Sequence, residues 1–347
     1  MFLKNTWYVA GWSHEVTAGE LMARTIIGTP IVFWRDPQGD VVAMPDRCPH
    51  RGAPLSKGRL EEGGVLRCMY HGMTFNASGA CTYVPGGQQR IPTGADLPRF
   101  PVVERNKWIW IWMGEADKAD ASLIPDTYWL DSPDWRYKPD YMHYKVDYLL
   151  IADNLLDFSH LAFVHEKTLG GSAGYADVRP EIQRLDRGLR ISRWFMDSPP
   201  APFVKNLVNW TDNVDRWNIY DFVVPGVLLM DSGSAPAGSG AREGNRQGAV
   251  EFRSAQALTP ETENTTHYFF SQAHNFALDD ATITEKLHAT LVAGFKEDWD
   301  MIHAQAATLA LDPDFKMMPL NVDNALGNFR WLMDKLISTE RAQLRAA

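Results

Sequence analysis

Two short stretches of this chain each contain one cysteine and one histidine. Cys48 and His50 form a C-x-H pair, and Cys68 and His71 form a C-x-x-H pair further along. Thiolates and imidazoles are the side chains that bind soft and borderline metals in proteins. Because each stretch offers one sulfur and one nitrogen, two neighbouring loops can hold a two-metal centre with sulfur ligands on one metal and nitrogen ligands on the other.

These ligand types predict a Rieske [2Fe–2S] cluster, in which two histidines replace two cysteines on one iron and the centre moves single electrons. A structural zinc site is one alternative, but its pairs are usually C-x2-4-C and H-x3-5-H. The other alternative is that the four residues are unrelated. The chain has only three Cys and ten His, so two such pairs close together are not expected by chance. Pro49, Gly52, Pro54 and Gly72 are turn formers that let the backbone approach cluster sulfurs.

The third cysteine, Cys81, lies outside both ligand loops, and we expect it to be a small buried hydrophobe. Neither loop carries a second cysteine, so a disulfide cannot join the two loops. This argues against the respiratory-complex kind of Rieske protein and favours the ferredoxin or oxygenase kind.

The composition disfavours some classes of binding partner and indicates a cellular compartment. The net charge of −9 disfavours nucleic acids and anionic membranes. No apolar run approaches the ~20 residues that cross a bilayer, and the first ten residues lack the apolar core of a signal peptide. Three cysteines, two of them claimed by the cluster, suit a reducing compartment. We therefore expect a soluble, cytoplasmic protein.

Short strands and turns dominate the N-terminal part, which we predict to be an all-β Rieske domain over residues 1–125. Residues 30–35 and 41–44 flank the turn sequence of residues 36–40, which is typical of a hairpin. Residues 107–113 form a strand rich in Trp and Ile. A stretch rich in Pro and Asp, residues 125–139, is the expected linker.

A second, α+β domain is predicted over residues 126–347. Its expected elements are a helix at 148–160, strands near 189–195, 217–224, 248–258 and 267–273, and a long helix at 281–311 that ends near Pro313. The stretch 232–248 is rich in Gly, Ser and Ala. We interpret it as a mobile lid or surface loop between two strands.

A second group of chemically active residues falls on the first of these helices. Asp153, Asp157 and His160 are spaced i, i+4, i+7 and share one face of an ideal helix, with Asn154 one step around. A polar stripe on so apolar a helix is either exposed or lines an interior site. His165 would lie about 140° from His160 on an ideal helix. The helix must therefore end, bend or widen between them if they are to bind one metal.

The long helix offers a third ligand, Asp298, which shares an otherwise apolar stripe with Leu291, Phe295 and Ile302. A buried carboxylate is costly unless it is paired or bound to a metal. Two histidines and one carboxylate form the facial triad of non-haem Fe(II) oxygenases. The alternatives are ordinary core or helix-end histidines, and an Asp298 that is exposed or paired with a distant arginine.

Several motifs together identify a family. The chain resembles the α-subunits of Rieske non-haem iron aromatic oxygenases, within them the vanillate O-demethylase and toluenesulfonate methyl-monooxygenase group, over nearly its full length. The resemblance rests on residues 4–10, 48–55 and 68–72, on 153–160, and on 215–217, 259–262 and 297–298.

The resemblance implies a role for each candidate residue. Cys48, His50, Cys68 and His71 would bind the [2Fe–2S] cluster, and His160, His165 and Asp298 would bind a mononuclear Fe(II). Asp157 matches the family's bridging acid, which connects a cluster histidine to an iron histidine across subunits of a head-to-tail homotrimer. Asn154 matches a residue near the iron. The second domain is then expected to have a helix-grip (START-like) fold, an antiparallel sheet curved around the long C-terminal helix.

The resemblance also implies an activity. The chain would be the terminal oxygenase of a monooxygenase or demethylase that uses O2 and electrons from NADH, delivered by a reductase or ferredoxin. Its substrate would be a small aromatic acid bearing a methyl or methoxy group. The alternative from a different class is a Rieske electron carrier with a non-catalytic second domain. Candidates for substrate contacts are Arg216, Arg242, Arg246 and Arg253 for an acid group, and Trp194, Trp210, Phe222 and Phe276 for a ring. The alternatives are solvated or structurally paired arginines and aromatic side chains of the core.

Overall fold

The computed structural model describes residues 1–86, 90–166, 168–169, 178–208 and 210–346. The chain divides into two compact units. The first contains Met1–Asp126 with Thr259–Glu263, and the second contains Thr127–Leu258 with Asn264–Ala347. The sequence pattern carries no signal for placing Thr259–Glu263 in the first unit.

Short antiparallel strands build the first unit, in three sheets with the orders β1-β10-β9, β2-β3-β4 and β5-β6-β7-β8. Their bounds are Trp7–Trp12 (β1), Met22–Ile26 (β2), Thr29–Arg35 (β3), Val41–Pro45 (β4), Arg59–Glu61 (β5), Val65–Arg67 (β6), Thr74–Phe75 (β7), Cys81–Tyr83 (β8), Val102–Arg105 (β9) and Trp108–Trp112 (β10). The predicted hairpin is confirmed, because Arg35 of β3 pairs with Val41 of β4 across the turn.

Tryptophan and isoleucine alternate along β10, and every one of its residues is buried. Trp112 lies opposite Trp7 of β1, with ring centroids 5.4 Å apart in an edge-to-face arrangement. A separate apolar cluster holds Cys48 and Cys68 together with aliphatic and aromatic side chains. The two cysteines are therefore anchored in a packed core.

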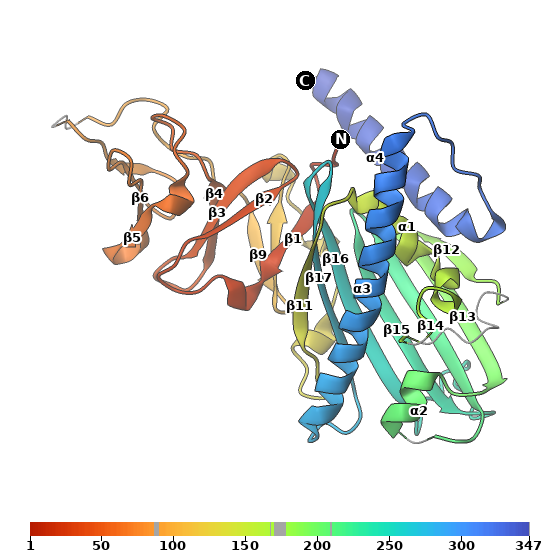
Figure 1. Ribbon diagram of the computed structural model, residues 1–347. Helices are drawn as coiled ribbons and strands as arrows, with labels where there is room; N and C mark the ends of the chain where they lie inside the picture. The colour runs from red at the N-terminus through yellow and green to blue at the C-terminus, as the bar shows by residue number, and fades with distance from the viewer. Residues whose placement is uncertain (87–89, 167, 170–177, 209, 347) are drawn as a thin grey trace. The chain divides into compact units, whose positions relative to one another are not determined.

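The second unit is a seven-stranded sheet in the order β11-β17-β16-β15-β14-β13-β12 (Figure 1). Its strands are Pro139–Tyr144 (β11), Glu181–Leu185 (β12), Gly188–Ser198 (β13), Val214–Val223 (β14), Val227–Pro236 (β15), Val250–Thr262 (β16) and Thr265–His274 (β17). The helices are Tyr148–Leu156 (α1), Pro202–Val208 (α2), Ala281–Leu311 (α3) and Asn324–Ala346 (α4).

The long helix α3 runs along one face of this sheet, as Figure 1 shows. The ring of Phe295 on α3 lies 4.8 Å from that of Phe270 and 5.3 Å from that of Tyr268, both on β17. The side chain of Asp280 accepts a hydrogen bond from Thr282 N and caps the start of α3. The predicted α+β architecture, with an antiparallel sheet gripping a long helix, is confirmed.

Two local predictions need correction, and one helix was not predicted. The first helix ends at Leu156 rather than His160, because Asp157 adopts an extended backbone. Strand β15 runs to Pro236, so Ser232 belongs to a strand rather than to a loop. Helix α4 was not predicted; its Phe329 packs edge-to-face on Phe222 of β14, with ring centroids 4.7 Å apart. Among the described helices, none combines the length and apolar character needed to cross a membrane.

Candidate metal centres and substrate cavity

His160 is presented by a turn that follows the end of α1. The carboxylate of Asp157 accepts a hydrogen bond from Ser159 N (2.9 Å) and caps a 3-10 turn over Phe158–Ala162. His160 Nδ1 lies 2.6 Å from the main-chain oxygen of Asp157. A carbonyl oxygen only accepts, so Nδ1 carries the proton and the lone pair of neutral His160 is on Nε2.

His165 reaches the same point from the turn beyond, and its side chain is fully buried. Its Nδ1 lies 2.8 Å from Oε2 of Glu297 on α3, and the hydroxyl of Thr168 donates to the same oxygen at 2.6 Å. An ionised Glu297 only accepts, so Nδ1 is the donor and Nε2 is left with a lone pair. Glu297 thus orients this imidazole in the way that outer carboxylates orient metal-binding histidines.

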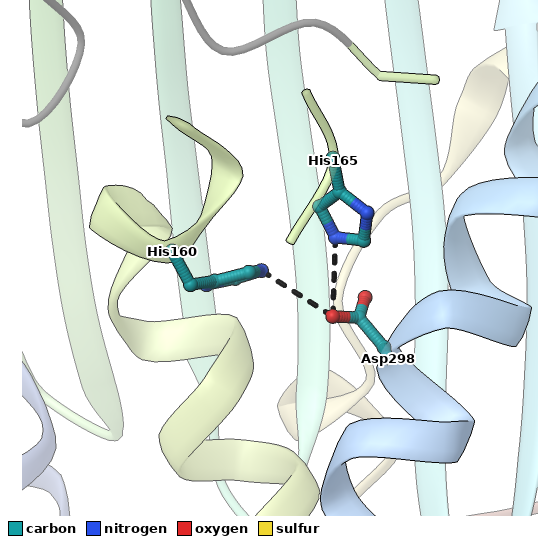
Figure 2. A group of neighbouring side chains, drawn as sticks. All are labelled: His160, His165 and Asp298. Carbon is teal, nitrogen blue, oxygen red and sulfur yellow. Dashed lines mark ion pairs between the residues drawn. The ribbon is translucent and has the colours of Figure 1, made fainter. Parts of the chain in front are cut away.

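Asp298 completes the group from the buried stripe of α3. Its Oδ1 lies 3.1 Å from His165 Nε2 and 3.5 Å from His160 Nε2 (Figure 2). One candidate ligand atom from each of the three residues lies within 4.8 Å of the other two. Asn154 Nδ2 donates to the same Asp298 oxygen at 3.0 Å, so the structure brings Asn154 to this group as well.

The donor set fits a bound cation. His165 Nε2 is buried and has no hydrogen-bond partner among the described residues, although it faces a carboxylate oxygen. Burial lowers the pKa of His160. At His165 burial also acts to lower the pKa, but the carboxylates of Asp298 and Glu297 outweigh it and raise the pKa. Two imidazole nitrogens and a carboxylate that converge on one point suit a non-haem Fe(II) with open coordination positions.

The two cysteine loops of the first unit have the same backbone hydrogen bonds. Cys48 N donates to Ala53 O and Gly52 N to Cys48 O; Cys68 N donates to Met73 O and Gly72 N to Cys68 O. Gly52 and Gly72 have φ values of +71° and +86°, which favour glycine. The loops are therefore two copies of one ligand-presenting turn.

These loops bring two buried thiols and two exposed imidazoles together. Cys48 and Cys68 are 3% and 2% exposed, whereas the rings of His50 and His71 are exposed and 4.6 Å apart. Burial raises the pKa of the Cys48 thiol, and the neighbouring Cys68 adds to that effect. Two adjacent thiolates in a packed core need a cation, so the donor set fits an iron–sulfur cluster with its histidine side toward solvent. All three cysteines are free of disulfides.

A cavity of about 110 Å³ opens beside the His160–His165–Asp298 group, within the second unit. Its apolar wall includes Phe158, Phe203 and Phe295. Its polar side chains, apart from the triad, are uncharged: Asn154, Asn218, Ser232, Gln256, Gln272 and Thr290. A small aromatic molecule is the kind of ligand that such a lining accepts.

Comparison with known proteins agrees with both centres. Residues 6–101 match the Rieske [2Fe-2S] domain, and residues 144–339 match the vanillate O-demethylase oxygenase C-terminal domain. The chain belongs to this family of Rieske oxygenases. The oxygenase is thus an oxidoreductase that carries a [2Fe–2S] cluster and a mononuclear iron. The match to an oxygenase domain favours this class over the electron-carrier alternative.

Two relatives and one solved structure illustrate the similarity. The oxygenase is 47% identical over 344 residues to the iron-sulfur subunit of a toluene-4-sulfonate monooxygenase system of Comamonas testosteroni, with 98% of each chain covered. It is 33% identical to a vanillate O-demethylase oxygenase subunit of Pseudomonas sp. (strain HR199 / DSM 7063), with 100% and 98% covered. A crystal structure of dicamba monooxygenase bound to 3,6-dichlorosalicylic acid matches with a TM-score of 0.91, 32% identity and coverage of 98% and 99%.

The acidic residues around α1 separate in the structure, contrary to the shared face that the spacing predicts. Asp153 pairs with Arg330 of α4, which ties the two helices together. Asp157 lies beyond the helix end, where its carboxylate meets the Ser159 hydroxyl at 2.5 Å and Arg193 Nη2 at 3.6 Å. The early end of α1 explains the difference, because the helical repeat stops before Asp157.

None of the four candidate arginines lines this cavity, although Arg216 lines a smaller one beside it. Side chains alternate along a strand, so Trp217 points away from the face of β14 that carries Arg216 and Asn218. Arg246 lies over the Trp217 ring and pairs with Asp231, and Arg253 pairs with Asp231 too. Arg242 pairs with Glu181. The loop after β15 therefore covers the opposite face of the sheet and is no lid over the cavity.

None of the four candidate aromatic residues lines this cavity, and the alternative that such residues belong to the core describes them better. Trp194 packs on Trp217, with ring centroids 5.6 Å apart, and Phe276 packs on Phe252. Trp210 belongs to the same apolar cluster as Phe252. Glu297 and Thr168, which hold His165, were not predicted as site residues. Glu297 stands directly beside Asp298 in the chain, but spacing alone does not show that it reaches a histidine from another segment.

Proposed function

We propose that this chain is the terminal oxygenase that hydroxylates the methyl or methoxy group of a substituted aromatic acid. The main support is the convergence of His160, His165 and Asp298 at one side of an apolar cavity. The named substrates of relatives, toluene-4-sulfonate, vanillate and dicamba, support the substrate class. Product would follow from insertion of one oxygen atom of O2 into a C–H bond, while the other leaves as water with two electrons and two protons. A hydroxylated methoxy group then releases formaldehyde, and a hydroxylated aryl methyl group is a benzylic alcohol.

We assign the metal ligands by donor type and geometry. Cys48, His50, Cys68 and His71 would hold the cluster, and His160, His165 and Asp298 the mononuclear iron. When bound, the cluster supplies single electrons and the iron supplies open positions for O2. The chain's own residues orient the site: Glu297 holds His165, and the Asp157 carbonyl holds His160.

Asp157 is proposed as the bridge between the two centres. Its carbonyl already accepts from His160, while its carboxylate is fixed by Ser159 and balanced by Arg193. The exposed ring of His71 would reach this carboxylate in a neighbouring subunit of a head-to-tail homotrimer. A reductase or ferredoxin component would bring electrons from NADH. A soluble, cytoplasmic location, in keeping with the cysteine content, remains part of the proposal.

The proposal is tested with a panel of methyl- and methoxy-substituted aromatic acids, NADH and a compatible reductase. We expect formaldehyde or a hydroxymethyl product in step with NADH oxidation. Asp157→Asn should keep both metal centres and lose turnover, because the link between them is removed. Absence of hydroxylated product from the whole panel, with both metals present, would contradict the oxygenase role. Full coupled activity of Asp157→Asn would contradict the bridge alone.

A further inference from the structure

The cavity beside the triad has a smaller neighbour. A second cavity of about 70 Å³ shares part of its wall with the first, namely Leu161, Leu169, Phe203, Asn218 and Ser232. The two cavities are therefore neighbours within the second unit. The His160–His165–Asp298 group lines the first, and Arg216 and Phe195 line the second.

Arg216 reaches this space because of its place on β14. It lies two residues before Asn218 on the same face of the strand, roughly 7 Å further along. Only 8% of Arg216 is exposed, and its guanidinium carbon stands 4.5 Å from the centre of the Phe195 ring. An arginine keeps its charge under such burial and offers a planar fork of N–H donors.

The charged side chains of the lining are divided between the two cavities. Among the described residues that line the two cavities, Arg216 is the one side chain with a fixed positive charge, and Asp298 is the one carboxylate. The side chains between them are apolar or neutral amides and hydroxyls. A buried guanidinium in a largely apolar wall favours an anionic group on whatever binds beside it.

We infer that Arg216 binds the acid group of the substrate, a carboxylate or a sulfonate, and directs the methyl or methoxy group at the other end of the ring toward the triad. This inference rests on the proposed oxygenase function. Arg216 would then determine specificity for substrates in which the acid group and the reactive group lie at opposite positions of the ring. Acids with the reactive group at position 4 of the ring fit the two cavities better than those with it at position 2.

The test measures binding of matched ligands by calorimetry on the cluster-containing protein. The ligands are 4-methylbenzoate and toluene-4-sulfonate, with 4-methylbenzamide and toluene-4-sulfonamide as uncharged counterparts. We expect the wild type to prefer each acid to its amide. Arg216→Gln should weaken acid binding by about 10- to 100-fold, the usual range for a hydrogen-bonded charge, and leave amide binding unchanged.

Two further variants sharpen the result. Arg216→Lys keeps the charge without the fork and should give intermediate acid affinity. Arg242→Gln is the matched control, because Arg242 pairs with Glu181 on the other face of the sheet and should not alter binding. An unchanged preference for acids in Arg216→Gln would overturn the inference. If the Arg216 variants fail to fold, the wild type still decides, since equal affinity for acids and amides would overturn it too.

Turnover separates this inference from the proposed function. If the wild type binds the acids through Arg216 but yields no hydroxylated product with a reductase, the oxygenase proposal fails and the binding site stands. If the wild type hydroxylates acids and amides equally well, and Arg216→Gln does the same, the function stands and the role of Arg216 fails. A 4-methyl acid that binds no better than its 2-methyl isomer would contradict the proposed orientation.

Discussion

The two metal centres of this oxygenase are built in opposite ways. In the first unit, two loops with the same backbone hydrogen bonds present the proposed cluster ligands, and both imidazoles are exposed. In the second unit, His165 and Asp298 are buried and come from segments far apart in the chain. An electron-transfer centre needs a face that a partner can approach, whereas a site for O2 chemistry benefits from the exclusion of water. The burial of the proposed ligands agrees with these two different tasks.

The largest effect is expected from a substitution that removes the cluster and leaves the mononuclear iron in place. Cys68→Ser should abolish the visible spectrum of the cluster and NADH-coupled turnover, while the iron of the second unit is retained. Absorbance and iron analysis measure both results. Cys81→Ala is the matched control, because Cys81 lies outside the ligand loops although it is buried in the same apolar cluster. A normal Rieske spectrum in Cys68→Ser would refute the ligand assignment.

The converse change removes the mononuclear iron and spares the cluster. Asp298→Asn should lose this iron and lower turnover by more than about 100-fold, since ligand removal exceeds the 10- to 100-fold effect of outer partners. Iron content and product formation are the measurements. Asp300→Asn serves as control, because Asp300 is exposed on the same helix and pairs with Lys296. Retention of tightly bound mononuclear iron in Asp298→Asn would count against the triad.

A smaller change tests whether the buried centre depends on its supporting residues. Glu297→Ala removes the acceptor for His165 Nδ1 and should weaken Fe(II) binding by about 10- to 100-fold. Anaerobic Fe(II) titration of the protein with its cluster intact measures the change. Glu285→Gln, on the exposed side of α3, should have no effect. An unchanged Fe(II) affinity in Glu297→Ala would show that Glu297 does not support the site.

The smallest effect is expected from removal of the Arg35–Glu104 ion pair in the first unit. The hydrogen bond from Arg35 holds the pKa of Glu104 below its usual value, so the pair stabilises the fold above the ordinary glutamate pKa and loses this contribution as the pH falls through the lowered one. Glu104→Gln should cost less than about 1 kcal/mol at pH 7, because the pair is partly exposed. Thermal unfolding should show a constant difference from pH 8 to about 5. If the destabilisation by Glu104→Gln grew steadily as the pH fell over this range, the result would contradict a lowered pKa of Glu104.

The same contrast explains what the sequence could predict. The Rieske loops and the β3–β4 hairpin depend on turn residues and short spacings, which are local properties of the chain. The bounds of α3 and the burial of Asp298 follow from helical periodicity over many residues. These features needed no knowledge of distant contacts.

The remaining features depend on tertiary structure. The spacing required the helix to change between His160 and His165, but the helix already ends at Leu156 because Asp157 bonds to Ser159 instead of continuing the helix. Which arginine lies on the cavity side of the sheet depends on the alternation of side chains along β14. The hydrogen bond between His165 and Glu297 joins two distant segments, and no pattern in either segment predicts it.

The most direct test of the account is the ratio of iron to acid-labile sulfide in the wild-type protein, after anaerobic loading with Fe(II) and desalting. We expect about three iron ions for two sulfides, two in the cluster and one at His160, His165 and Asp298. A ratio of one iron to one sulfide, with no mononuclear iron retained, would contradict the claim that this chain carries both centres.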